Sequence, residues 1–365
     1  MNLIPSSLLL LGVGGAGASM TRSIVRAYGS GIRAMILDTD AQSGGNGDMP
    51  FTLLGGNRLA GRGTGGQPAS ARAAFQDDPS LLDPILEGVR TVVVVTALGG
   101  GTGGGATCEL LKHLHTLGIA TLVFATTPFT FEGAERVQTA RTAIGPIEQH
   151  ADVSIFLPLD ELVSTSGTDN MKDALAHGVS TLASGVTLLW QLLEKPGYIR
   201  FDAERLRGIL TGCGRAHFAT ATARGENRVD DVLASLAENP QLKQNGSTSH
   251  VRMLVVGILA GDDLRLTEVG AIAGGLSAAF GAGAALELGT VNDESAFSGQ
   301  LTVVTLVFDE AATPARKTVV DGGTPASEHV ALAGNQRFKN TEKTMWNNED
   351  LDIPTYLRRQ LTLDR

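Results

Sequence analysis

Short runs of apolar residues alternate with helix-forming segments along the first half of the chain. Five of these runs predict strands, at Leu8–Val13, Ala34–Leu37, Thr91–Leu98, Ala120–Thr126 and Val153–Leu157. Most of them are apolar throughout rather than alternating with polar residues, which is typical of strands buried on both faces. Buried strands that are separated by helices predict an α/β fold, with a parallel sheet covered by helices on both sides.

One long helical pattern divides the chain near its middle. Residues Asp169–Leu193 are rich in Ala, Leu and Val, and Pro196-Gly197 ends the pattern. Because the segment is apolar on several sides, we predict a helix that is buried between two domains.

The second half of the chain predicts a smaller α/β unit followed by a tail. Its elements are expected at Ala203–Thr211 and Val229–Leu236 (helices), Asn239–Ser249 (a polar turn), Val251–Ala260 (a strand), Leu266–Ala279 (a helix), and Ala284–Thr290 and Gly299–Asp309 (strands). Beyond Glu310 the composition shifts to Ala, Thr, Pro, Gly and charged residues, which is typical of a disordered linker. We therefore expect a first domain over residues 1–168, the long helix over 169–196, a second domain over 197–309, a linker over 310–340 and a recognition segment over 341–365.

The composition narrows the class of protein. A chain of 365 residues is long enough for two domains, and a net charge of −9 argues against a nucleic-acid partner. The two cysteines, Cys108 and Cys213, build neither a disulfide framework nor a zinc site, and the histidines show no metal-ligand spacing. We expect a cytoplasmic protein, because the first leucine run fits a strand rather than a signal peptide and no stretch is long enough to span a bilayer.

The most informative segment is Gly99–Gly105, which follows a buried strand and precedes the helix-forming stretch Ala106–His113. Seven residues without bulky side chains let a backbone press against a ligand. The N-terminus of the helix behind them has bare N–H groups and a favourable dipole for an anion. We predict a phosphate loop here, and a flexible linker is the alternative.

A second glycine motif, Gly12–Gly17, satisfies G-x-G-x-x-G between a strand and a helix that is expected to open at Ser19. The next strand ends in Asp38-Thr-Asp40, the layout of a dinucleotide-binding fold in which an acid holds a ribose hydroxyl. By itself this motif favours an NAD-dependent oxidoreductase.

The combination of glycine loops favours a polyphosphate instead. Two such loops on neighbouring strands suit phosphates gripped by backbone amides from both sides, and Gly61–Pro68 adds a third glycine-rich loop. The P-loop signature G-x-x-x-x-G-K-[ST] is missing from the sequence.

In their order along residues 8 to 309, these segments resemble the tubulin/FtsZ superfamily and, within it, bacterial FtsZ. The resemblance implies a parallel-sheet GTP-binding domain, a long central helix and a second, smaller α/β domain. It also implies GTP/GDP as cofactor with Mg²⁺, and a head-to-tail homopolymer as the assembled form. The residues that it assigns to nucleotide binding are Gly14, Gly15, Ala16, Asp38, Asp40, Gly63, Thr64, Gly65, Gly99, Gly100, Gly101, Thr102, Gly103, Gly104, Glu132, Arg136 and Asp173.

Some of these positions depart from the family pattern or allow a simpler interpretation. Asp38 stands where Asn is usual, Gly104 stands where Thr or Ser is common, and Thr168 lies near the place of the aromatic residue that stacks on the base. The resemblance implies that Glu132 and Arg136 contact the ribose, with an ordinary surface ion pair as the alternative. It implies that Asp173 recognises guanine, with a solvated helix residue as the alternative.

The expected hydrolytic residues depart further from the pattern. In the superfamily a synergy loop after the central helix inserts acidic residues into the neighbouring subunit's nucleotide pocket and positions the attacking water. The FtsZ pattern Asn-x-Asp-x-x-Asp corresponds here to residues 200–205, in which Asp202 is retained and Arg200 and Arg205 replace the Asn and the second Asp. An arginine can stabilise charge on the transferring phosphate, and Glu204 is a candidate for the missing acid. We therefore predict weakened or altered hydrolysis, and subunit-contact arginines without a catalytic part are the alternative.

The tail segment Asp352–Arg359 resembles the terminal FtsZ peptide that docks on membrane-tethering partners, with Tyr356 in place of Phe. We predict that residues 350–360 contact such an adaptor or an anionic membrane, which would recruit the protein to the inner face of the membrane. A solvent-exposed tail without a partner is the alternative. For the whole protein, an FtsZ-like filament for cell division or membrane remodelling is the first hypothesis. A non-polymerising GTP-dependent switch or scaffold is the second, and an NAD-dependent oxidoreductase is the third.

Overall fold

The computed structural model describes residues 7–28, 31–164, 170–194, 197–200, 208, 211, 213–243, 251–280, 283–309, 345–346 and 349–350. The chain divides into two compact units, Met1–Arg316 and Lys317–Arg365. The described residues of the second unit form a two-stranded antiparallel ladder of β11 (Met345–Trp346) and β12 (Glu349–Asp350).

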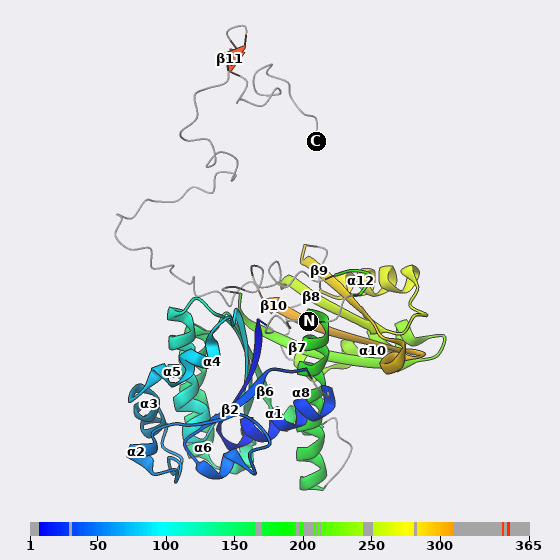
Figure 1. The fold of residues 1–365 in the computed structure, drawn as a ribbon. Helices are drawn as coiled ribbons and strands as arrows, with labels where there is room; N and C mark the ends of the chain where they lie inside the picture. The colour runs from blue at the N-terminus through cyan, green and yellow to red at the C-terminus, as the bar shows by residue number, and fades with distance from the viewer. Residues whose placement is uncertain are drawn as a thin grey trace. The chain divides into compact units, whose positions relative to one another are not determined.

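The first unit is built on one ten-stranded sheet, with the strand order β3-β2-β1-β4-β5-β6-β7-β10-β8-β9 (Figure 1). Its strands are β1 (Leu8–Val13), β2 (Ala34–Asp38), β3 (Phe51–Leu53), β4 (Thr91–Ala97), β5 (Ala120–Thr127), β6 (Val153–Pro158), β7 (Gly214–Arg224), β8 (Val251–Ala260), β9 (Ala285–Asn292) and β10 (Gln300–Asp309). Neighbouring strands from β3 to β7 are parallel, whereas β10 runs antiparallel to both β7 and β8.

Helices cover both faces of this sheet. They are α1 (Gly14–Tyr28), α2 (Gly56–Leu59), α3 (Pro68–Gln76), α4 (Asp83–Leu86), α5 (Gly101–Thr116), α6 (Ala134–His150), α7 (Leu159–Ser164), α8 (Met171–Glu194), α10 (Arg228–Glu238), α11 (Pro240–Lys243), α12 (Leu266–Phe280) and α13 (Glu294–Phe297). Helices α3, α5 and α6 pack on one face of the parallel strands, and α1 and α8 pack on the other (Figure 1). Helices α10 and α12 cover the strands of the second half.

Helix α8 packs against both the parallel and the antiparallel parts of the sheet. Its buried residues share one core with strands β4 to β6 and with β7, β8 and β10. A Cβ at Gly185 would lie 2.1 Å from Cζ of Phe218 on β7, and a Cβ at Gly257 on β8 would lie 2.0 Å from Cδ1 of Leu192. These two glycines therefore let the helix approach the sheet closely.

The strands expected in the first half are confirmed, and they are parallel as predicted. The expected start of the first helix at Ser19 is wrong, since α1 begins at Gly14, directly after β1. The polar turn expected over 239–249 contains the short helix α11. Strand β7 was not predicted, because its sequence is rich in Ala and Thr and lacks a run of large apolar residues. It forms a strand by pairing with β10, which is distant in sequence. Within the described part of the chain, none of the helices combines the length and the apolar character that crossing a bilayer requires.

Candidate functional site

The two glycine-rich motifs meet at the carboxyl ends of neighbouring strands. Strands β1 and β4 pair in parallel, and each leads into a helix, α1 and α5. Gly14 has a φ of +77°, and a Cβ built on it would lie 3.3 Å from the backbone N of Gly103 and 3.6 Å from Cβ of Thr102. Two helix N-termini, each carrying partial positive charge, therefore lie side by side, which suits a chain of phosphates.

The glycine run behind β4 is not the open loop that the sequence suggested. Helix α5 begins at Gly101, so the run forms its first turns, and residues 101–105 are buried. A Cβ at Gly103 would lie 2.0 Å from the carbonyl oxygen of Ala97, and one at Gly105 would lie 2.2 Å from that of Pro68. These glycines are required because backbone approaches them from both sides, which overrides the low helix propensity of glycine.

The end of β2 joins the same site. The Asp38 side chain is 3% exposed, and its carboxylate accepts hydrogen bonds from the Thr39 amide (2.7 Å) and the Ser43 hydroxyl (2.5 Å). The buried hydroxyls of Thr39 and Thr102 are 2.7 Å apart, so β2 is linked directly to the start of α5. Asp40 begins a short 3₁₀ helix and accepts a hydrogen bond from the Gln42 amide at 2.9 Å.

The third glycine-rich segment folds over the start of α5. The Gly63 amide donates to the carbonyl of Thr39 at 3.1 Å. A Cβ at Gly101 would lie 2.0 Å from the Thr64 hydroxyl, whereas one at Gly65 would meet nothing within 4 Å. Gly65 has a φ of +59° and is exposed, so this segment covers α5 and still presents open backbone.

A pocket of about 490 Å³ lies beside the first turns of α1, and we call it the α1–α6 pocket. Its lining residues come from several elements: Ala16, Ser19, Met20, Ala97, Leu98, Thr126, Pro128, Phe129, Glu132, Arg136, Leu159 and Val179. Arg136 Nε forms a 3.0 Å ion pair with Glu132, whose other carboxylate oxygen accepts from the Phe129 amide at 3.0 Å. Gly99, with a φ of +95°, leaves room for the Arg136 side chain, since a Cβ there would lie 2.8 Å from Arg136 Cγ. The two ribose candidates are thus paired with each other and also line a pocket.

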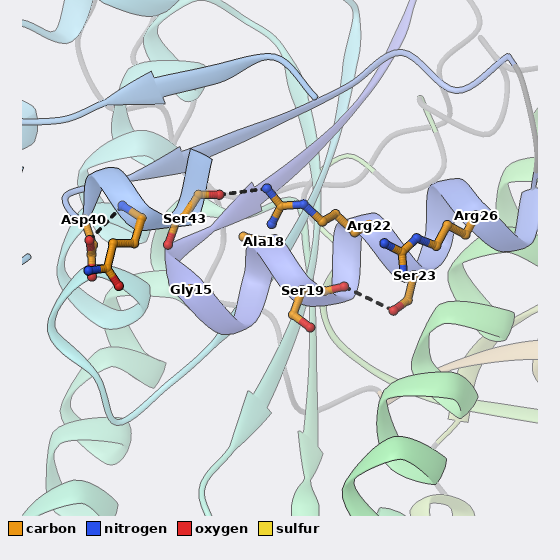
Figure 2. A pocket seen from close by; sticks show the side chains of 9 residues that line it. Gly15, Ala18, Ser19, Arg22, Ser23, Arg26, Asp40 and Ser43 are labelled. Carbon is orange, nitrogen blue, oxygen red and sulfur yellow. Dashed lines mark hydrogen bonds between the residues drawn. The ribbon is translucent and has the colours of Figure 1, made fainter. Parts of the chain in front are cut away.

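A second pocket, of about 450 Å³, lies between α1 and the segment after β2, and we call it the arginine pocket. Figure 2 shows Arg22 and Arg26 along one side of it, with Asp40 and Ser43 across from α1. Arg22 donates to the Ser43 carbonyl at 2.8 Å and pairs with Asp48 at 3.0 Å. The hydrogen bond from Arg22 lowers the pKa of the Asp48 carboxyl. Thr39, Arg22 and Ser43 were not among the predicted site residues. Thr39 lies between the two predicted acids Asp38 and Asp40, whereas no motif marks Arg22 or Ser43.

Other candidates lie apart from this assembly or outside the described residues. Asp173 is exposed in the first turn of α8, where its amide donates to the Asn170 side chain at 3.3 Å, and it lines neither pocket. Arg200 is exposed. Asp202, Glu204 and Arg205 lie outside the described residues, as do Thr168, the linker 310–340 and most of the terminal segment.

The described residues contain no group of three or more His, Cys, Asp or Glu side chains placed to hold a metal ion. The carboxylate of Asp38 and the hydroxyl of Thr102 are oxygen donors of the kind that Mg²⁺ prefers, so the residues present fit a nucleotide-bound cation.

Comparison with known proteins gives concordant matches. The model of the Tubulin/FtsZ family GTPase domain matches residues 7–167. The cell division protein FtsZ of Pseudomonas aeruginosa is 30% identical over 354 residues, which span 96% of this chain and 88% of that protein. FtsZ of Pseudomonas putida is 29% identical over 362 residues, which span 98% of this chain and 90% of that protein.

Solved structures share the fold. An FtsZ dimer from M. jannaschii superposes with a TM-score of 0.75 at 22% identity, covering 82% of this chain and 87% of that one. A GTPgS-bound protofilament of CetZ2 from Haloferax volcanii gives a TM-score of 0.68 at 20% identity, covering 82% of this chain and 92% of that one.

Proposed function

The chain belongs to the tubulin/FtsZ family, and on that premise we propose that it is a GTP-binding cytoskeletal protein that assembles head to tail into filaments. The observation that carries the proposal is the juxtaposition of two helix N-termini, α1 and α5, at Gly14 and Gly103. The GTP phosphates would lie against the amides of these first turns, because both helix dipoles favour negative charge there. Magnesium would neutralise part of the phosphate charge when bound.

The remaining contacts follow from the segments that lie beside the starts of α1 and α5. The segment around Gly63, Thr64 and Gly65 would close over the terminal phosphate. The ribose would enter the α1–α6 pocket, where Glu132 and Arg136 would exchange their mutual ion pair for contacts with its hydroxyls. Asp173 lies in the first turn of α8, and Val179 further along the same helix lines the pocket. Asp173 would contact the base from this first turn.

We further propose that hydrolysis is completed by a neighbouring subunit and is slower than the family pattern would give. Asp202 would position the attacking water, with Glu204 as a substitute acid, while Arg200 and Arg205 would face the phosphates. The reason is electrostatic, since a cation in place of an acid removes an acceptor for the water.

The test combines light scattering with phosphate release, measured with GTP and Mg²⁺ over a range of protein concentrations. We expect scattering to rise with GTP, and turnover per subunit to increase with concentration because the site is shared. Turnover that is independent of concentration would contradict the shared site. Arg205→Asp should raise turnover, and an unchanged rate would mean that the lost acid is not limiting.

The same measurements separate the alternatives. A GTP-dependent switch or scaffold would bind GTP without scattering or filaments in electron micrographs. An NAD-dependent oxidoreductase would bind NAD in preference to GTP, and failure to bind NAD would eliminate it.

We also propose that residues 350–360 recruit the protein to the cytoplasmic face of the membrane, through an adaptor or anionic lipid. The chain truncated after Asn335 should lose co-sedimentation with anionic vesicles or with adaptor-bearing membranes while binding GTP normally. Retained recruitment would assign membrane contact to another part of the chain.

A further inference from the structure

The segment that leads into the synergy loop is attached to the edge of the sheet. It comprises residues 197–200, after α8, and it contacts β9, the last strand in the order of the ten-stranded sheet. The Thr290 amide on β9 donates to the Ile199 carbonyl at 2.8 Å. A Cβ built on Gly197 would overlap the Thr290 carbonyl oxygen, so only glycine permits this close approach. The backbone of the segment therefore lies directly against β9 before it reaches Arg200.

Two side chains of β9 complete the attachment. The Thr290 hydroxyl accepts from the Ile199 amide at 3.0 Å and donates to the Asn292 side-chain oxygen at 3.3 Å. The same oxygen of Asn292 accepts from the Tyr198 amide at 3.2 Å. Two consecutive amides of the segment are thus bonded by side chains, so the attachment depends on the identity of these two residues of β9.

The two β9 side chains are themselves held in place. Thr290 is 3% exposed, within the packed sheet. The Asn292 side-chain nitrogen donates to the carbonyl of Gly261, in the loop after β8, at 3.4 Å. Because the nitrogen of Asn292 is bonded to that loop, its oxygen is directed to the segment 197–200. The attachment point is therefore rigid.

The side chains of the segment contribute little to holding it there. Tyr198 is 70% exposed and Ile199 is 39% exposed. Arg200, with which the synergy pattern begins, is also exposed. Exposed side chains gain little free energy from burial, so the hydrogen bonds to β9 determine where this segment lies.

We infer that Thr290 and Asn292 are positioning residues for GTP hydrolysis, because they fix the point from which the synergy loop enters the neighbouring subunit's site. The inference rests on the proposed hydrolysis at a shared site and names two residues outside the loop on which its rate depends. Displacing a catalytic group by about 1 Å can lower a rate by about a hundredfold. Neither residue is expected to contact GTP, so their loss should lower kcat and leave KM unchanged.

The variants separate the hydroxyl of Thr290 from its packing. Thr290→Val removes the hydroxyl and keeps the β-branched shape, whereas Thr290→Ser keeps the hydroxyl. Asn292→Ala removes the acceptor for the Tyr198 amide and leaves Thr290 in place. Thr302→Val is the matched control, since Thr302 is 1% exposed on the neighbouring strand β10 and its hydroxyl is 3.0 Å from that of Thr222.

The experiment measures GTP turnover by the full chain with Mg²⁺, at protein concentrations where light scattering shows assembly. Hydrogen exchange of the nucleotide-free protein, read by mass spectrometry on a peptide containing residues 197–200, reports the attachment itself. We expect kcat of Thr290→Val to fall about tenfold at unchanged KM, and its Tyr198 and Ile199 amides to exchange about tenfold faster. Asn292→Ala should change both in the same direction and less. Thr290→Ser and Thr302→Val should match the unmodified protein.

The outcomes distinguish this inference from the proposed function. An unchanged kcat in both Thr290→Val and Asn292→Ala, even with faster exchange, would overturn the positioning role and leave the shared site intact. An equal loss in Thr302→Val, or no recovery in Thr290→Ser, would also overturn it, because the effect would then come from packing. Absent turnover in the unmodified protein, or turnover per subunit that is independent of concentration, would overturn the proposed shared site and the inference with it. Thermal unfolding shows whether each variant is folded.

Discussion

The two glycine-rich helix starts use the same residue for different physical reasons. At the start of α1, Gly14 adopts a left-handed φ and Gly15 is exposed, with its nearest neighbour 3.6 Å from a built Cβ. At the start of α5, Gly101 and Gly103 are buried, and a Cβ at either would lie 2.0 Å from a neighbouring atom. Glycine at the α1 start provides an unusual backbone conformation and open amides, whereas at the α5 start it permits close packing.

This difference changes how a glycine motif is interpreted. The run over residues 99–105 is the more specific motif of the two, yet most of it serves to seat α5 between β4 and the segment before α3. The less specific motif at α1 presents the more open surface. A glycine motif can therefore be specific because its backbone packs closely, and contact with a ligand is only one of the reasons for it.

The comparison predicts its largest effect at Gly103. Gly103→Ala would place a methyl group 2.0 Å from the Ala97 carbonyl oxygen, and strand backbone cannot move aside cheaply. We expect the free energy of unfolding to fall by about 3 kcal/mol, with the loss of GTP binding as α5 shifts. Urea denaturation measures the stability. A variant as stable as the unmodified protein would show that the position of α5 does not depend on this contact.

A smaller effect is expected at Gly14, through its conformation. Gly14→Ala forces an L-residue to a φ of +77° and crowds the Gly103 amide, so we expect a loss of about 1–2 kcal/mol in stability together with weaker GTP binding. Gly118→Ala is the matched control, since Gly118 also has a positive φ, +69°, but has open space around it at the far end of α5. The control should lose similar stability and bind GTP normally. Equal loss of GTP affinity in both variants would mean that the weaker binding does not arise at the start of α1.

The smallest effect is expected at Gly104, in the middle of the same buried run. A Cβ there would lie 3.5 Å from that of Ala143, which is an ordinary contact. Gly104→Ala should leave the stability unchanged or raise it by up to about 1 kcal/mol, because alanine favours the helix. Calorimetric unfolding measures this. A loss as large as that of Gly103→Ala would mean that burial alone, rather than the identity of the atom in contact, excludes side chains from this run.

Much of the fold was predictable because its signals are local. The apolar runs that became β1, β4 and β5 identify buried strands, and their order with intervening helices implies parallel pairing. Strand β7 was missed because its burial depends on pairing with β10, far away in sequence. The start of α1 was misplaced for a related reason, since the glycines before Ser19 are poor helix formers that tertiary contacts force into a helix.

The site was predictable in outline and not in its connections. The glycine motifs and the acids after β2 were identified from the sequence, and the structure brings them together. Thr39 and Thr102 lie in two separate motifs, and the sequence does not show that their hydroxyls meet. Arg22, which donates to the Ser43 carbonyl, lies in no motif. Such contacts join positions that only the sheet order makes neighbours.

The sequence by itself determined most of the strands of the parallel sheet, the positions of the glycine motifs and the order of these segments, because these depend on nearby side chains and backbone preferences. Only the tertiary structure decided which glycines serve packing and which leave amides open, because that depends on atoms from distant segments. It also decided that the acid at Asp38 is buried behind the α1 start with neutral partners. The position of that charge follows from the pairing of β1 with both β2 and β4, which places three separate loops against one another.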